Sequence, residues 1–242
     1  MVILHDVKPA RRCAGGVALA VSGVLANAEN SHLARSLARQ LAESRVVVVD
    51  ASRLRLHHGV TPTFFSNALM RAGGWPAVRL IVTGADPRLH AALVTCGAAR
   101  DVLLVDDMAH AWAHAHHRPE RVARRLHLSS AQVSVPRAIA VVESAGIAWA
   151  APASVIEDAR RVVRELVDNA VRHARTASVL QVSADPAELR IAVRDFRVGG
   201  TGARGRGLGL VSSIATSWGV NPRSDGKSVW ALLPPGHPSP ET

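Results

Sequence analysis

The chain has 242 residues and a formal net charge of +10, and 48% of its residues are hydrophobic but only 3% are aromatic. This length favours two domains of ordinary size with aliphatic cores. No apolar run approaches the roughly 20 residues that span a bilayer, and no signal peptide surrounds the first apolar run, Val17 to Val21, so we expect a cytoplasmic protein without a membrane segment. Cys13 and Cys96 lack metal-type spacing, which favours free thiols in a reduced compartment.

The excess of basic residues would suit a nucleic acid, an anionic membrane or an acidic protein. The arginines are scattered, however, and the densest group, Arg118, Arg121, Arg124 and Arg125, lies in the expected linker between the domains. No expected strand interleaves aromatic residues with arginine in the manner of single-strand binders, and no helix-turn-helix pattern is present. A solvated surface is the preferred interpretation, and nucleic-acid binding is disfavoured.

The first half of the chain alternates between strand-like and helix-like segments. Short β-branched runs predict strands, among them Val46 to Val49, which is typical of a strand covered on both faces. Segments with capping residues and apolar positions at helical spacing predict helices. The expected strands are residues 17–21, 45–50, 78–82 and 101–105, and the expected helices are 30–43, 61–72, 86–97 and 108–115. This alternation predicts an α/β domain with helices packed on a sheet.

The order and length of these segments resemble the STAS domain, the fold of anti-sigma-factor antagonists. The resemblance covers about residues 17–117, and the segments 46–52 and 103–107 carry it. It implies a STAS-like sheet with packed helices over residues 1–118, and a role in binding partner proteins.

The switch residue of that family is missing. Antagonists carry a phosphorylatable serine in a turn after the central strand, whereas the corresponding stretch here, residues 56–61, contains no serine. Thr61 and Thr63 offer hydroxyls nearby, although Thr61 can equally cap the following helix. The domain therefore resembles a STAS fold kept for binding, and the sequence leaves open whether either threonine accepts a phosphoryl group.

Four histidines, His110, His114, His116 and His117, crowd the end of this domain. The first two are four residues apart on an expected helix, a spacing at which two imidazoles can share a zinc ion. No cysteine or set of carboxylates completes such a site. A polar domain end that runs into a linker is the simpler interpretation.

Arg118-Pro119 interrupts the alternating pattern and places the domain boundary near residue 118. Residues 119–127 are expected to form a short basic helix. Residues 128–135, with apolar positions among serine and glutamine, are expected to form a strand.

Two helices are expected next, over residues 136–146 and 153–174, and the second has a broad apolar stripe at helical period. The opposite face of that helix carries Glu165 and Asn169, which are four residues apart and therefore stand one turn apart on the same face. A carboxylate and an amide oxygen at this spacing supply a proton acceptor and a ligand for a hard metal ion. By itself the pair is also an ordinary feature of a solvated helix face.

The string from Glu165 to Ala174, Glu-Leu-Val-Asp-Asn-Ala-Val-Arg-His-Ala, resembles the N-box of GHKL ATPases. The resemblance implies an α/β sandwich of two layers, the GHKL or Bergerat fold, over residues 119–242, and it implies ATP and Mg²⁺ as ligands. It also implies roles for two residues. Glu165 would accept a proton from the attacking hydroxyl or water, and Asn169 would bind the magnesium ion on the phosphates.

Residues 178–182 and 189–194 are expected to form a strand–turn–strand that leads into Asp195. In the GHKL family an aspartate at this place hydrogen-bonds the adenine amino group, so the resemblance implies this role for Asp195. Arg197 departs from the family, since many members have glycine there. A turn residue at the end of a strand is the alternative interpretation of Asp195.

A glycine-rich segment, residues 199–209, precedes a helix expected over residues 210–217. Glycines before a helix let backbone N–H groups close on phosphate oxygens. The segment is not a P-loop, because no Gly-Lys-Ser follows, and it is not a Rossmann fingerprint, because it follows an antiparallel pair. It resembles the second glycine box of the GHKL family, which implies nucleotide contacts from Gly199, Gly205, Arg206, Gly207, Leu208 and Gly209.

Residues 224–233 are expected to form a turn and a last strand. The run from Gly226 to Trp230 resembles the closing Gly-Lys-Thr-Val-Trp segment of anti-sigma-factor kinases, with Ser228 in place of threonine. The resemblance implies that the Ser228 hydroxyl bonds near Asp195 in the nucleotide site. In total the GHKL resemblance covers about residues 128–234.

The two resemblances together favour a regulatory protein of the anti-sigma-factor serine/threonine kinase type, fused to a STAS-like domain. Its partners would be a sigma factor or a STAS antagonist, and a homodimer is compatible with this interpretation. The alternative is a protein-docking module that holds ATP without catalysis. A histidine kinase is disfavoured, because the region ahead of the ATP domain is α/β and not a helical hairpin that carries a phosphoacceptor histidine.

Overall fold

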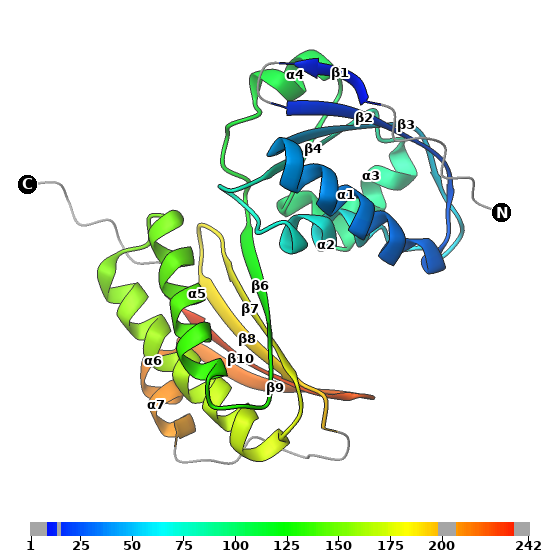
Figure 1. Ribbon diagram of the computed structural model, residues 1–242. Helices are drawn as coiled ribbons and strands as arrows, with labels where there is room; N and C mark the ends of the chain where they lie inside the picture. The colour runs from blue at the N-terminus through cyan, green and yellow to red at the C-terminus, as the bar shows by residue number, and fades with distance from the viewer. Residues whose placement is uncertain (1–8, 14–15, 198–206, 235–242) are drawn as a thin grey trace, which may run out of the picture. The chain divides into compact units, whose positions relative to one another are not determined.

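A computed structural model describes residues 9–13, 16–197 and 207–234 (Figure 1). The chain divides into two compact units, Met1–Val122 and Ala123–Thr242. Each unit has its own sheet with helices packed on it, so the fold class is α/β with two domains. The division after residue 122 lies close to the boundary expected near residue 118.

The first unit is built on a five-stranded sheet with the strand order β1-β2-β3-β4-β5. The edge pair β1/β2 is antiparallel, and every later pair is parallel. The short edge strand β1 was not expected from the sequence. The strands are β1 (Pro9–Cys13), β2 (Gly16–Leu25), β3 (Val46–Leu56), β4 (Arg79–Thr83) and β5 (Leu103–Val105).

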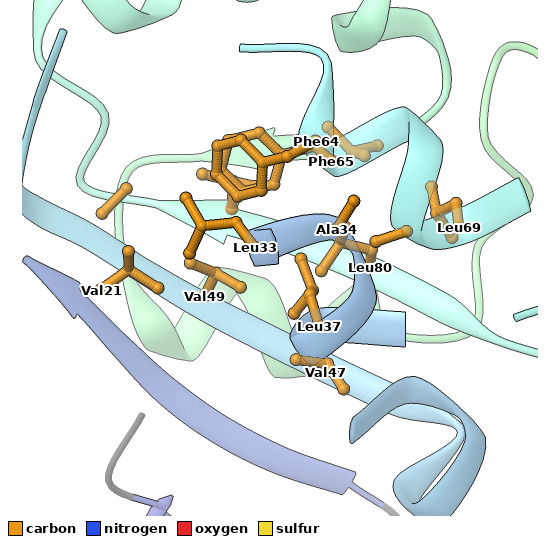
Figure 2. Packing of buried hydrophobic residues seen from close by; sticks show 14 of the residues in the cluster. Val21, Leu33, Ala34, Leu37, Val47, Val49, Phe64, Phe65, Leu69 and Leu80 are labelled. Atoms are coloured by element: carbon orange, nitrogen blue, oxygen red, sulfur yellow. The ribbon is translucent and has the colours of Figure 1, made fainter. Parts of the chain in front are cut away.

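Three helices of this unit cover one face of the sheet. Because each parallel connection steps in the same direction, right-handed crossovers place all three on one side. Figure 2 shows the resulting core, in which Leu33 and Leu37 of the first helix lie against Val47 and Val49 of β3, close to Phe64 and the neighbouring Phe65. The helices are α1 (Asn30–Ser44), α2 (Phe64–Arg71) and α3 (Pro87–Thr95), with single 3-10 turns at Asn27–Glu29 and Ala98–Arg100.

A smaller apolar cluster covers the other face of the same sheet. Val46, Val48 and Ile81 pack there against Ala111 of α4 (Met108–Ala113) and against Ala115 just after it. The expected alternation of strands and helices in this half is confirmed. It was predictable because continuous β-branched runs are typical of parallel strands that are buried on both faces.

An ion pair joins the half-buried Arg121, at the end of the first unit, to the buried Asp101. Arg121 donates from Nε to Asp101 Oδ1 at 2.7 Å and from Nη2 to Asp101 Oδ2 at 2.8 Å. Ser66 Oγ donates to the same Asp101 Oδ2 at 2.6 Å, so α2 is joined to the segment that leads into β5. The carboxylate is 8% exposed and relies on these donors for its solvation.

The second unit has a five-stranded sheet with the order β6-β7-β8-β10-β9. The pairs β7/β8, β8/β10 and β10/β9 are antiparallel. Figure 1 shows α5, α6 and α7 on the same side of this sheet, and α6 contacts α5, α7, β8 and β10. The elements are β6 (Val122–Leu128), α5 (Ser134–Ala148), α6 (Ala153–Asn169), a π-helical turn η3 (Ala170–Ala174), β7 (Ser178–Ala184), β8 (Leu189–Asp195), α7 (Gly207–Ile214), β9 (Ser217–Arg223) and β10 (Gly226–Leu233).

Two predictions at the start of this unit were wrong. Residues 122–128 form strand β6, not a basic helix, and residues 129–133 are not a strand. The two arginines in the middle of β6 hid its alternation. Arg124 turns toward the helices, where its Nη1 donates to Ser144 Oγ of α5 at 2.9 Å and its guanidinium lies 5.9 Å from the centre of the Trp149 ring. Its long aliphatic stem can occupy a half-buried position that a sequence pattern assigns to apolar residues.

The end of the unit also differs from expectation. The helix expected over 210–217 is α7, which begins at Gly207 and ends at Ile214, and Ser217–Arg223 is strand β9. Edge strands with polar faces give little periodic signal. Among the described residues, no helix combines the length and the apolar character needed to cross a membrane.

We predict that Asp101→Ala lowers the free energy of unfolding by about 1–3 kcal/mol, because the half-buried Arg121 guanidinium and the Ser66 hydroxyl both lose the carboxylate that accepts their hydrogen bonds. Urea unfolding would measure the change. Asp106→Ala is the matched control, since Asp106 is exposed, and it should change stability by less than about 0.5 kcal/mol. Equal effects of the two substitutions would contradict a structural role of the ion pair.

Candidate functional site

Helix α6 presents a polar face at the end that meets the sheet and α7. Its apolar stripe is buried, while Glu165 and Asn169 are half-buried. Neither side chain makes a hydrogen bond or ion pair with another described residue. Their neighbour Asp168, in contrast, pairs with Arg172 Nε at 2.8 Å. Two polar groups, one turn apart and partly withdrawn from water, are therefore available to a ligand.

The helix changes character directly after Asn169. Residues Ala170–Ala174 form a π-helical turn, which ends at Arg175 in the left-handed region with a φ of 54°. The sequence pattern predicted a continuous helix to residue 174 and gave no sign of this turn. Isolated π-helical turns are rare, and they occur frequently at functional sites because they displace the side chains around them.

Asp195 lies at the end of β8 on the face of the sheet that the helices cover. It alternates with the buried Ile191 and Val193, and it is only 2% exposed. Its Oδ1 accepts a hydrogen bond from the backbone N–H of Arg197 at 3.2 Å. Its Oδ2 lies 4.0 Å from Nζ of Lys227, which stands directly opposite on β10. A carboxylate acceptor is thus held in a fixed orientation beneath the helix layer.

Asp195 and Lys227 stand in one row across the sheet, and a buried hydroxyl extends this row on the other side of Asp195. Ser178 of β7 pairs in register with Asp195 and is 2% exposed. Its Oγ has no hydrogen-bond partner among the described residues. Three adjacent strands therefore place a hydroxyl, a carboxylate and an ammonium group side by side. This set can satisfy a planar ligand that both donates and accepts hydrogen bonds.

Ser228 does not belong to this row. It pairs in register with Arg194 and lines a hollow on the opposite face of the sheet. The expectation that its hydroxyl bonds near Asp195 therefore differs from the structure, and Lys227 occupies that position instead. The sequence held a signal for this: Lys227 shares the alternation of the buried Val229, Ala231 and Leu233, and alternate residues of a strand point to the same face.

The backbone approaches closely where β8 and β10 begin to pair. Gly226 has a φ of 145°, and a Cβ there would lie 2.1 Å from the carbonyl oxygen of Asp195. Next to this contact, the backbone N–H of Phe196 donates to Thr176 Oγ1 at 3.3 Å, and the guanidinium of Arg197 donates to the carbonyl oxygen of His173. Arg197 thus ties the segment after β8 to the π-helical turn.

The structure describes only the last residues of the glycine-rich segment, from Gly207 on. Gly199, Gly205 and Arg206 lie outside the described residues. Helix α7 begins at Gly207, and Leu208 is half-buried. Gly209 is exposed, and a Cβ added there would meet no atom of the described residues within 4 Å. The first turn of α7 carries partial positive charge on its backbone N–H groups, which suits an anion.

The histidines at the end of the first unit form no comparable site. The rings of His114 and His117 meet edge to face, with their centres 4.8 Å apart, and His110 Nδ1 lies 3.1 Å from Asp107 Oδ2. Within the described part of the chain, no group of three or more His, Cys, Asp or Glu residues could hold a metal ion.

No family model matches the sequence, and no curated protein matches it. Among solved structures, the chain is similar to the RsbU and RsbW domains of Rv1364c from Mycobacterium tuberculosis, with a TM-score of 0.40 and 19% sequence identity. The match covers 47% of this chain and 33% of that chain. A similarity of this size indicates neither a shared site nor a shared activity.

We predict that Gly226→Ala lowers the free energy of unfolding by about 2 kcal/mol or more, because the methyl group would collide with the backbone of Asp195. Gly209→Ala is the control. Its methyl group enters open space on a helix, so stability should stay unchanged or rise by up to about 1 kcal/mol. Thermal or urea unfolding of both variants distinguishes them, and a Gly226→Ala protein as stable as the original would refute the close approach.

Proposed function

We propose that the second unit binds ATP and Mg²⁺ as a GHKL-type domain, and that the first unit is STAS-like and docks partner proteins. One observation carries the nucleotide site. Glu165 and Asn169 are half-buried and unpaired within the described residues, on a helix that contacts both the strand of Asp195 and helix α7. An unpaired polar group that is partly desolvated costs free energy unless a ligand satisfies it.

Each residue has a distinct role in this proposal. Asn169 would bind Mg²⁺ through its side-chain oxygen, and the ion would neutralise charge on the triphosphate. Glu165 would accept the proton of the attacking hydroxyl or water. Asp195 would accept a hydrogen bond from the adenine amino group. The backbone of Gly207 and Gly209 at the start of α7 would hold phosphate oxygens, together with Gly199, Gly205, Arg206 and Leu208.

The donor set fits this ligand. Adenine presents an amino donor and a ring-nitrogen acceptor side by side, and the row formed by Ser178, Asp195 and Lys227 offers both complementary partners. Lys227 replaces Ser228 in this arrangement. The polar row is buried, so its hydrogen bonds to a base would be stronger than at an exposed site.

We further propose that the chain acts as an anti-sigma-factor-type serine/threonine kinase or ATPase that regulates a sigma factor or a STAS antagonist, alone or as a homodimer. A docking module that binds ATP without turnover is the second candidate. It is favoured by the stretch 56–61 of the first unit, which contains no serine; the exposed hydroxyls nearby are those of Thr61, in the stretch, and Thr63, two residues after it. Phosphotransfer from labelled ATP to either threonine or to an antagonist protein separates the two.

We predict that Asn169→Ala removes the Mg²⁺-dependent part of ATP affinity and leaves the thermal unfolding midpoint unchanged, because the side chain has no partner in the described protein. Calorimetric titration of ATP with and without Mg²⁺ measures this. If ATP binding by the variant still responds to Mg²⁺ as in the original protein, Asn169 is not the metal ligand.

Glu165→Gln should keep ATP affinity but reduce turnover by roughly 10²- to 10⁴-fold, the usual contribution of a general base. Glu157→Gln on the same helix is the matched control, because Glu157 is 56% exposed and pairs with Arg160 at 3.2 Å. It should leave turnover unchanged. If the wild-type protein binds ATP but neither hydrolyses it nor transfers its phosphate, the docking module is favoured.

Asp195→Asn should reduce the preference for ATP over ITP by roughly 10- to 100-fold. The carboxylate would accept a hydrogen bond from the adenine amino group, which inosine lacks, and a hydrogen bond to a charged group contributes about 1.5–3 kcal/mol. Competition titrations with the two nucleotides measure the ratio. An unchanged ratio would remove Asp195 from base recognition.

A further inference from the structure

The second sheet has a face that its own helices do not cover, and arginine and aromatic residues alternate along it. On β8 the buried positions Leu189, Ile191 and Val193 face the helices. Arg190 and Arg194 therefore point to the opposite side, and Phe196 follows in the same alternation. Phe196 is 37% exposed. The sequence pattern alone did not reveal this interleaving, because it depends on which face of β8 is covered.

Basic residues from the two edge strands join this row. Arg125 and His127 of β6 and Arg223 of β9 line, together with Arg190 and Arg194, one hollow of about 350 Å³. Of the described residues that line the hollow, none is acidic. Asp225 in the adjoining turn pairs with Arg194 at 2.5 Å, which leaves the face with an excess of positive charge. A surface of this kind attracts an anionic partner.

Aromatic rings lie under two of the guanidinium groups. The guanidinium carbon of Arg194 is 4.9 Å from the centre of the Phe196 ring, and that of Arg190 is 5.7 Å from the centre of the Trp230 ring. Trp230 in turn donates from Nε1 to Asn221 Oδ1 at 3.2 Å and lies against Gly219, where a Cβ would approach it to 2.9 Å. These contacts hold the cations close to the sheet surface, and the side-chain amides of Gln181 and Asn221 line the same hollow.

We propose that this open face of the second sheet, formed by Arg125, His127, Gln181, Arg190, Arg194, Phe196, Asn221 and Arg223, binds single-stranded nucleic acid. Guanidinium groups pair with phosphates in bidentate geometry. Unstacked bases pack on aromatic side chains and on guanidinium planes, and amides read base edges. An antiparallel sheet that carries these groups together offers all three kinds of contact.

Charge and composition favour this occupant over the alternatives. A protein interface is usually depleted of charge at its centre and built around an apolar core. Here Arg190 and Arg194 occupy the central strand, and Val179 and Ala192 are the only aliphatic residues among the described residues that line the hollow. A second copy of the same face would bring like charges together. The formal charge of +10 for the whole chain supports an anionic partner. The inference is independent of the nucleotide site, which lies on the other face of the sheet.

The test is fluorescence anisotropy of labelled 20-nucleotide single-stranded RNA and DNA, titrated with the full chain over a range of salt concentrations. The double variant Arg194→Gln/Arg223→Gln should weaken binding at least about tenfold and reduce the salt slope by about 1.4, since each phosphate contact with a single strand contributes about 0.7. Arg194→Lys should leave the salt slope unchanged, because it keeps the charge, but it should lose part of the affinity, because an ammonium group lacks the planar bidentate donors.

Two further proteins make the experiment specific. The control Arg137→Gln/Arg161→Gln removes the same charge from exposed positions on α5 and α6, and binding should change by less than about twofold. Phe196→Ala keeps every charge but should weaken binding at least about fivefold through lost base stacking. Circular dichroism checks that each variant is folded.

Three results would overturn the proposal. The first is an equal loss of affinity in the face variants and in the control, which would mean diffuse attraction to the whole basic chain. The second is equal binding of a duplex of the same length. The third is a polyglutamate peptide that binds as tightly as the single strand and with the same dependence on Arg194 and Arg223, which would identify an acidic protein segment as the occupant.

Discussion

The pairing register of β10 against β8 is the constraint on which the second unit depends. Gly226 meets the backbone of Asp195 with no room for a side chain, and this contact sets Lys227 opposite Asp195 and Ser228 opposite Arg194. Because side chains alternate between the two faces of a sheet, a shift by one residue would exchange the two rows. The buried carboxylate of Asp195 would then lose its ammonium neighbour, and an unpaired buried charge strongly destabilises the folded state.

The same register separates two kinds of chemistry across one sheet. The side under the helices holds Ser178, Asp195 and Lys227 in a buried row, next to a helix whose Glu165 and Asn169 are unpaired within the described residues. The open side carries arginines over aromatic rings. Low exposure strengthens directional hydrogen bonds on the first side, and solvent access on the second side suits a long anionic ligand. The proposed ATP site and the proposed nucleic-acid surface therefore do not compete for residues.

Periodic patterns predicted most helices and the strands with strong apolar runs. The run Val46 to Val49 became the central strand β3, and the stripe of α6 became the buried face of that helix. The patterns failed where polar residues carry the structure. Strand β6 was hidden by Arg124 and Arg125, and the π-helical turn after Asn169 left no periodic trace. Ser228 was assigned by likeness of a short motif, without the strand alternation that gives its position to Lys227.

The sequence by itself determined that the chain has two α/β units, that one amphipathic helix carries Glu165 and Asn169 on one face, and that a glycine-rich segment follows a strand pair. These features are local, since they follow from spacing along one element. Only the tertiary structure decided which side of each strand is covered, and so which residues meet. Asp195, Lys227 and Ser178 come from three strands, and the arginines of the open face come from β6, β8 and β9. Such sets depend on pairing between distant segments, which no local pattern specifies.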